Sequence, residues 1–152
     1  MTIVIDTGVF YAFFDRKDSH YLDSVALLTH SLQGKFGQPF TTDYVVLEST
    51  ILLQRRLGAK VSLALLNLIE TSGIKTVIVG DQYYKALTLF HQNFQRLSLC
   101  DAATLAVMNQ LDIVALASYD ERSFNGLVGS IYGKSYFSTL PQKDKETVKS
   151  VL

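Results

Sequence analysis

The sequence of 152 residues contains a single cysteine, Cys100. One thiol cannot form an internal disulfide, and such scarcity is typical of proteins in a reducing compartment, so we expect a cytoplasmic protein. No basic N-terminal region precedes a longer apolar run, so we also expect no signal peptide. The longest apolar stretches are far shorter than the roughly 20 residues of a membrane span, and we expect no contact with a membrane.

An excess of charge of either sign is also missing. Lys and Arg together number 14, as do Asp and Glu, and this balance argues against broad, non-specific binding to nucleic acid or to an anionic membrane. It leaves room for a small positive groove. Hydrophobic residues make up 48% and charged residues 18%, which is typical of a globular chain. We expect one domain over residues 1–152, in which residues 142–152 form either a short helix or a mobile tail.

The most informative stretch lies at the start of the chain. Ile3, Val4 and Ile5 are a continuous β-branched run, which predicts a strand buried on both faces of a parallel sheet. Asp6 follows at the carboxyl end of this strand, the edge at which ligands bind to open α/β sheets. The alternative is that Asp6 or Thr7 only caps the next helix.

Further strands alternate with helices along the rest of the chain. Apolar patterning predicts strands at residues 40–41, 76–79 and 113–117, and helices at residues 9–14, 19–33, 44–57, 61–70, 83–94 and 102–110. We expect Ser19 and either Thr42 or Asp43 to cap helices, residues 58–60 to form a turn, and Gly73 to end a helix. The glycine-rich, aromatic segment 126–141 receives no assignment. The alternation predicts an α/β/α sandwich with a central parallel sheet.

Four carboxylates occur where this architecture could bring them together: Asp6, Glu48, Asp101 and Asp120. Asp120 follows the strand at 113–117 and therefore shares an edge of the sheet with Asp6. Glu48 has helical spacing with Val45 and Leu52, which predicts that it lies on the apolar face of its helix unless it reaches water at the edge of that face.

Two of these acids have plausible structural roles instead. Ser98 and Asp101 have the spacing of a capping box, in which the acid bonds back to the helix start. Asp120 could be the N-cap of a short helix beginning at Glu121, and Ser118 with Glu121 offers a second capping box. Each signal alone is weak, and the joint placement of the acids is what suggests a site.

A cluster of carboxylates repels itself unless a cation lies among them. All-oxygen ligands suit Mg²⁺ or Mn²⁺. Zinc is disfavoured because Cys100 and the scattered histidines His20, His30 and His91 have no ligand spacing, and we interpret these histidines as surface or structural residues.

Two other classes of phosphate chemistry fit poorly. A haloacid-dehalogenase-like phosphatase also places an aspartate after its first strand, but it needs a second aspartate two residues later, where this chain has Gly8. A nucleotide-binding Rossmann domain is disfavoured because no Gly-x-Gly-x-x-Gly motif follows the first strand.

The ordered set of motifs resembles the PIN domain family, and within it the VapC-type toxin ribonucleases. The matching pieces are Ile-Asp6-Thr-Gly, Thr-Thr-Asp-Tyr-Val-Val-Leu-Glu48, Leu-Ser-Leu-Cys-Asp101-Ala-Ala and Ala-Ser118-Tyr-Asp120. The chain departs from the family between Asp120 and Phe124, where its spacing is one residue longer, and in segment 126–141.

The resemblance implies a PIN-like three-layer fold and metal-dependent endonucleolytic cleavage of RNA. Asp6, Asp101 and Asp120 would be the principal ligands of Mg²⁺ or Mn²⁺, and Glu48 would bind through water or orient the nucleophile. Thr7 and Ser118 match hydroxyl positions that support the metal or water.

The partners expected from this reading are an RNA substrate, a second copy of the chain and an antitoxin protein. Arg16, Lys17, Arg55 and Arg56 are candidates for contacts with the RNA backbone, although a solvated helix face explains most of them equally well. The alternatives are an RNA-processing nuclease without antitoxin control and a non-catalytic PIN-fold scaffold or RNA-binding protein.

Overall fold

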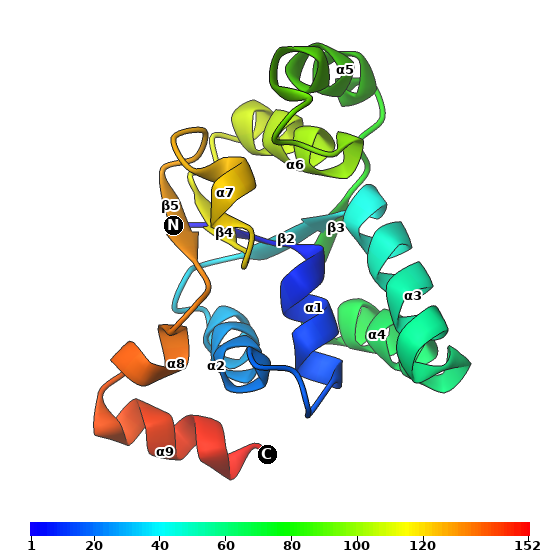
Figure 1. Cartoon of the computed structure of the whole chain (residues 1–152). Helices are drawn as coiled ribbons and strands as arrows, with labels where there is room; N and C mark the ends of the chain where they lie inside the picture. Colours follow the sequence, from blue (N-terminus) through cyan, green and yellow to red (C-terminus); the bar gives the residue numbers. More distant parts are fainter.

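The computed structural model describes residues 1–152 (Figure 1). Its strands are β1 (Ile3–Ile5), β2 (Pro39–Thr42), β3 (Lys75–Val77), β4 (Ala115–Ala117) and β5 (Ser130–Tyr132). Its helices are α1 (Thr7–Phe14), α2 (Tyr21–Leu32), α3 (Asp43–Leu57), α4 (Ala59–Ser72), α5 (Gln82–Asn93), α6 (Leu99–Gln110), α7 (Glu121–Phe124), α8 (Tyr136–Thr139) and α9 (Gln142–Ser150). Helices cover both faces of one sheet, so the predicted three-layer α/β/α sandwich is confirmed.

The first strand lies at the centre of the sheet. The strand order is β3-β2-β1-β4-β5, and every neighbouring pair is parallel. Ile3 is paired with Pro39 of β2 on one side and with Ala115 of β4 on the other. All of β1 is buried, as its β-branched run predicts. Because parallel strands end at the same edge, the residues that follow β1 and β4 meet there.

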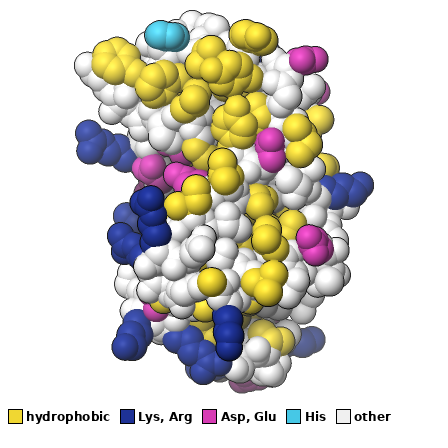
Figure 2. Space-filling model, turned by 90° about the vertical axis from the view of Figure 1, so that its right-hand side faces the viewer, with side chains coloured by type: hydrophobic (Ala, Val, Ile, Leu, Met, Phe, Trp, Pro, Cys, Tyr) yellow, Lys and Arg dark blue, Asp and Glu magenta, His cyan; other side chains and the backbone are white.

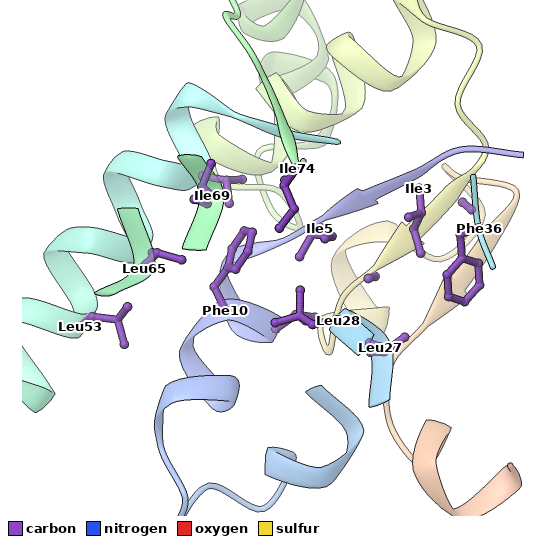
Figure 3. Packing of buried hydrophobic residues seen from close by; sticks show 14 residues of the cluster. Ile3, Ile5, Phe10, Leu27, Leu28, Phe36, Leu53, Leu65, Ile69 and Ile74 are labelled. Carbon is purple, nitrogen blue, oxygen red and sulfur yellow. The ribbon is translucent and has the colours of Figure 1, made fainter. Parts of the chain in front are cut away.

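Successive side chains of β1 point to opposite faces of the sheet and enter two separate cores. Ile3 and Ile5 belong to a core beneath α1 to α4, together with Phe10, Leu27, Leu28, Leu53 and Leu65 (Figure 3). Val4 belongs to the core beneath α5, α6 and α7, together with Ala103, Val107, Leu116 and Phe124. A single strand of three residues therefore fixes both helical layers relative to the sheet.

Two of the predicted helix boundaries are confirmed. The side chain of Thr42 accepts a hydrogen bond from the backbone N–H of Val45 (3.1 Å), which makes Thr42, not Asp43, the N-cap of α3. Gly73 ends α4 in the left-handed conformation at φ 86°.

Two other boundaries differ from the prediction. No side-chain cap bond is made at the start of α2, where His20, not Ser19, occupies the N-cap position. The predicted turn at residues 58–60 is confined to Gly58, whose φ of 101° lets α4 begin at once with Ala59.

Two strands are shorter than predicted because backbone N–H groups at their predicted ends form hydrogen bonds outside the sheet. The backbone N–H of Val79 donates to Oδ1 of Asp43 (2.9 Å), so the chain has already left the sheet after Val77. The backbone N–H of Ile113 donates to the carbonyl of Met108 (2.9 Å) at the end of α6, and β4 begins only at Ala115.

The unassigned segment 126–141 supplies the edge strand β5 and the short helix α8. The C-terminal segment forms α9, which packs beside α2 through the fully buried Val148 (Figure 1). An ion pair between Lys35 and Asp144 (3.0 Å) joins α9 to the loop after α2. No helix is both long and apolar enough to cross a membrane.

Candidate active site

Asp6 is the buried acid at the end of the central strand. Its side chain is 7% exposed, and its backbone N–H donates to the carbonyl of Ala117 (3.0 Å), which fixes it against β4. Burial raises the pKa of Asp6 to about 7, and the charges of Asp101 and Glu48 add to this effect. A hydrogen bond from Ser118 opposes the rise.

Ser118 connects two of the predicted site acids. Its hydroxyl donates to Oδ2 of Asp6 (2.8 Å) and accepts from the backbone N–H of Asp120 (3.0 Å). Ser118 is itself held by β5, because its backbone N–H donates to the carbonyl of Tyr132 (3.0 Å). The Ser118 hydroxyl therefore donates to Asp6. The capping box that Ser118 and Glu121 could have formed is absent, and Asp120 is the N-cap of α7.

Glu48 projects from α3 toward the same edge. The prediction that it lies on the apolar face with Val45 is wrong: Val45 is buried and Glu48 is exposed, at the edge of that face. Its Oε2 accepts a hydrogen bond from the hydroxyl of Thr7 (2.5 Å), at the first residue of α1. Thr7 thus orients a carboxylate.

Asp101 has both of the roles that its spacing suggested. Its Oδ2 accepts from the backbone N–H of Ser98 (2.9 Å), and its own N–H donates to the Ser98 hydroxyl (3.1 Å), which completes a capping box on α6. It also faces the other acids. Burial raises its pKa against the opposing hydrogen bonds from Ser98, and the charges of Asp120 and Glu48 raise it further.

Asp120 is exposed and caps α7. Its Oδ1 accepts from the backbone N–H of Ser123 (3.1 Å) and its Oδ2 from the Ser123 hydroxyl (2.6 Å). Ser123 lies between Asp120 and Phe124. We did not single out Ser123 from the sequence, although an aspartate followed three residues later by serine is a recognisable capping pattern.

All four acids line one hollow of about 500 Å³, together with Thr7, Gly8, Ser98, Ser118 and Tyr119. No basic side chain lines it. The place of Tyr119 in this hollow could not be predicted from the sequence, because its contacts are with residues about 95 positions away, such as Ser24. The structure therefore brings Asp6, Glu48, Asp101 and Asp120 together around one hollow, as expected from the sequence.

The donor set suits a hard divalent cation, since it offers only carboxylate and hydroxyl oxygens. No three of the acids lie close enough to hold one ion between them as arranged here. This spacing is compatible with Mg²⁺, which keeps several waters and commonly takes only one or two carboxylates from a protein.

The four basic candidates do not gather at one place. Arg55 lines an apolar groove of about 480 Å³ that adjoins the acidic hollow and shares Thr7 and Glu48 with it. Arg56 lies over the ring of Tyr11 at 5.9 Å. Arg16 lines a separate hollow between α1 and α2, and Lys17 is exposed in the loop that follows α1. Only Arg55 is next to the acids.

The PIN domain model matches residues 3–127. A VapC ribonuclease of Archaeoglobus fulgidus is 30% identical over 156 aligned positions, which cover 100% of this chain and 96% of the relative.

Two solved structures share the fold. One is Mycobacterium tuberculosis VapC20, a sarcin-ricin loop cleaving toxin, with TM-score 0.73, 23% identity and coverage of 84% of this chain and 97% of that one. The other is FitAcB from Neisseria gonorrhoeae, with TM-score 0.58, 18% identity and coverage of 86% and 96%. The family model and the full-length relative together show that this chain belongs to the PIN domain family.

Proposed function

We propose that the chain is a Mg²⁺- or Mn²⁺-dependent endoribonuclease that acts in the cytoplasm as the toxin of a toxin–antitoxin pair. The observation that carries this proposal is the single hollow lined by Asp6, Glu48, Asp101 and Asp120. The full-length relative, a VapC ribonuclease, and the solved toxin VapC20 support the same reading.

A divalent ion held there would supply an activated water and would neutralise charge on the phosphate during hydrolysis of a phosphodiester bond. Asp6, Asp101 and Asp120 would hold it, directly or through its bound waters, and Glu48 would bind through water or orient the nucleophile. Ser118 keeps Asp6 in place and Thr7 orients Glu48, so that these carboxylates stay aimed into the hollow. The capping box uses only Oδ2 of Asp101, which leaves Oδ1 available.

Cleavage of a labelled RNA by the purified full chain tests this function. We expect cleavage with Mg²⁺ or Mn²⁺, none in excess EDTA, and a loss of at least 100-fold in Asp6→Asn, in line with other metal-site and electrostatic deletions. Asp81→Asn is the matched control, because Asp81 is an exposed aspartate outside the hollow. Full cleavage in EDTA would overturn the proposal.

The toxin role is tested in cells. We expect induced expression to arrest growth, and co-expression of an adjacent small reading frame to relieve the arrest. Cleavage without growth arrest would favour an RNA-processing nuclease. A chain that binds no Mn²⁺ by calorimetry and cuts no RNA would be a scaffold or an RNA-binding protein.

We also propose that the chain forms a homodimer through the face that carries α3 and α5. Apolar side chains gather over the α5 end and the middle of this face (Figure 2). Leu47 is 61%, Tyr84 74% and Phe94 63% exposed, which is costly for a monomer in water. Light scattering should give twice the chain mass of 17.0 kDa, and Leu47→Glu should reduce it. A monomer at micromolar concentration would contradict the dimer.

A further inference from the structure

Two aromatic rings stack at the rim of the acidic hollow. The rings of His20 and Tyr119 have centroids 4.2 Å apart and planes inclined by 12°. Tyr119 lines the acidic hollow, and its hydroxyl is fixed by hydrogen bonds with Ser24 (2.5 Å) and with the carbonyl of His20 (3.3 Å). A methyl group at Gly8 would already touch the Tyr119 ring at 3.4 Å, so this ring has little room to move. Tyr119 therefore forms a fixed backing for the His20 imidazole.

His20 also lines a second hollow of about 400 Å³, beyond the stacked pair. Its lining residues come from the start of α2, with the two residues before it, and from the segment between β5 and the end of α8. Its lining includes Ser19, Ser135, Ser138, Phe137 and Lys134. The stacked pair is thus shared between the two hollows: Tyr119 faces the acids and His20 faces the second hollow.

The second hollow has one basic lining residue, Lys134, and one acidic lining residue, Asp23. Lys134 is exposed and forms no salt bridge within the chain. Oδ2 of Asp23 lies 3.5 Å from Nδ1 of His20, on the edge of the ring that carries the stack. The two oxygens of Asp23 also accept from the backbone N–H groups of Ser135 (3.1 Å) and Phe137 (2.8 Å). These bonds hold Ser135 at φ 64°, an uncommon conformation for a residue other than glycine, and so fix the loop that carries Lys134.

We propose that the second hollow is a nucleotide subsite, in which a base of the bound RNA stacks on the outer face of His20 and a neighbouring phosphate contacts Lys134. The inference rests on the proposed function, since it concerns the strand that flanks the scissile phosphate. The acidic hollow has no basic lining residue, so a cationic side chain that contacts a flanking phosphate must lie outside it. Bases stack on aromatic rings, histidine included, in single-stranded RNA sites.

Proton NMR of the full chain in EDTA tests the stacking independently of cleavage. The chain has three histidines, whose imidazole signals should be separate, and His20→Ala should assign the signal of His20. Adenosine monophosphate should move the His20 signal upfield through the ring current of the base. Ribose 5-phosphate should not, and the exposed His91 on α5 should respond to neither. A His20 signal that shifts with neither compound, or shifts equally with both, would overturn the proposal of a subsite.

Cleavage kinetics provide the second test. His20→Ala should raise KM about tenfold, the lower range for removal of a stacking ring, with kcat largely retained. His20→Phe should restore KM because it keeps the ring. Lys134→Gln should also raise KM, whereas Lys149→Gln, an exposed lysine on α9, should not. Unchanged KM in both His20→Ala and Lys134→Gln would overturn the proposal.

The two proposals fail in different ways. A chain that cuts no RNA but whose His20 signal responds to adenosine monophosphate would lose the nuclease function and keep a nucleotide site. A chain that cuts RNA with no response at His20 and no change in KM would keep the nuclease function and lose the subsite. Thermal midpoints of all variants, compared with the unaltered chain, show whether each one folds.

Discussion

The hydroxyl of Ser118 donates a hydrogen bond to Oδ2 of Asp6 across 2.8 Å and so joins the ends of two neighbouring strands. Residues 112 positions apart are brought together because β1 and β4 are parallel and end at the same edge. The bond is buried and its acceptor is a carboxylate, so its contribution to stability depends on the charge of Asp6.

Ser118→Ala should lower the free energy of unfolding by about 1.5–3 kcal/mol at pH 8, where Asp6 is ionised, and by less at pH 5.5. Urea titrations at the two pH values measure this difference. Ser49→Ala is the matched control, because the Ser49 hydroxyl is equally buried but has no hydrogen-bond partner. An equal loss in the two variants would contradict a specific role for the Ser118 bond.

The metal-free protein should become less stable as the pH rises from about 4 to above 7. The pKa of Asp6 in the folded state is raised from 3.8 to about 7, so the folded chain binds more protons than the unfolded chain in this range. The stability that protonated Asp6 contributes is fully present below its unfolded pKa. It is lost as the pH rises through its folded pKa.

Urea unfolding in EDTA, compared between the unaltered chain and Asp6→Asn, isolates this effect. The difference between the two should change with pH by at most about 4 kcal/mol, since each pKa unit corresponds to about 1.4 kcal/mol. A difference that stays constant from pH 5 to pH 8 would show that Asp6 has an ordinary pKa. Excess Mg²⁺ should make the free energy of unfolding depend less on pH, because a bound cation favours the ionised form of Asp6.

The two roles of Asp101 can be separated by two variants. Ser98→Ala removes the cap bond to the N–H of Asp101 and should cost about 0.5–2 kcal/mol of stability while leaving the carboxylate in place. Asp101→Asn keeps a carbonyl oxygen for the cap and removes a charge that Glu48 and Asp120 repel, so the metal-free protein should be as stable or more stable.

The effects on RNA cleavage should be reversed: severe loss in Asp101→Asn and a small loss in Ser98→Ala. Thermal melts in EDTA and in Mg²⁺, alongside cleavage rates, give the comparison. If Asp101→Asn melts lower in EDTA and still cleaves at the unaltered rate, Asp101 is only a cap.

His30 should titrate below its ordinary pKa of 6.5. Burial is the main cause, and the ammonium group of Lys35, 3.0 Å from Nε2, adds to it. A lysine can only donate, so Nε2 accepts and Nδ1 donates to the Tyr136 hydroxyl (2.8 Å). Since the folded pKa is lowered, stability should fall as the pH drops below about 6.5.

An NMR titration of the His30 imidazole measures this pKa directly, and Lys35→Met should raise it. The protection factors for hydrogen exchange in α9, which correct for the intrinsic pH dependence of exchange, should fall at low pH, because protonated His30 repels Lys35, which pairs with Asp144 of that helix. A His30 that titrates at or above 6.5 in the folded chain would contradict this description.

The sheet centre and the order of the acids could be predicted from the sequence because they depend on local patterns. The run Ile3 to Ile5 is β-branched throughout, and parallel strands bring the residues after their carboxyl ends to one edge. Segment 126–141 could not be assigned, since β5 is only three residues long and is defined by its pairing with β4.

The acids themselves were identified correctly as neighbours, but the details of their support were not. Glu48 lies at the margin of its helix face, and its orientation depends on Thr7, which is 41 positions away. Ser123 holds Asp120 through a local pattern that we overlooked. The stack of His20 on Tyr119 arises only from the folded chain, so no local pattern reveals it.

The matched family region ends at residue 127, yet the edge of the site is completed by residues beyond it. The carbonyl of Tyr132 receives the backbone N–H of Ser118, and a methyl group at Gly133 would lie 2.1 Å from the Ser118 carbonyl oxygen. A genetic screen for inactive variants should therefore find changes at position 133, which has no reactive group. In this chain, residues beyond the matched family region are therefore needed to hold the site in place.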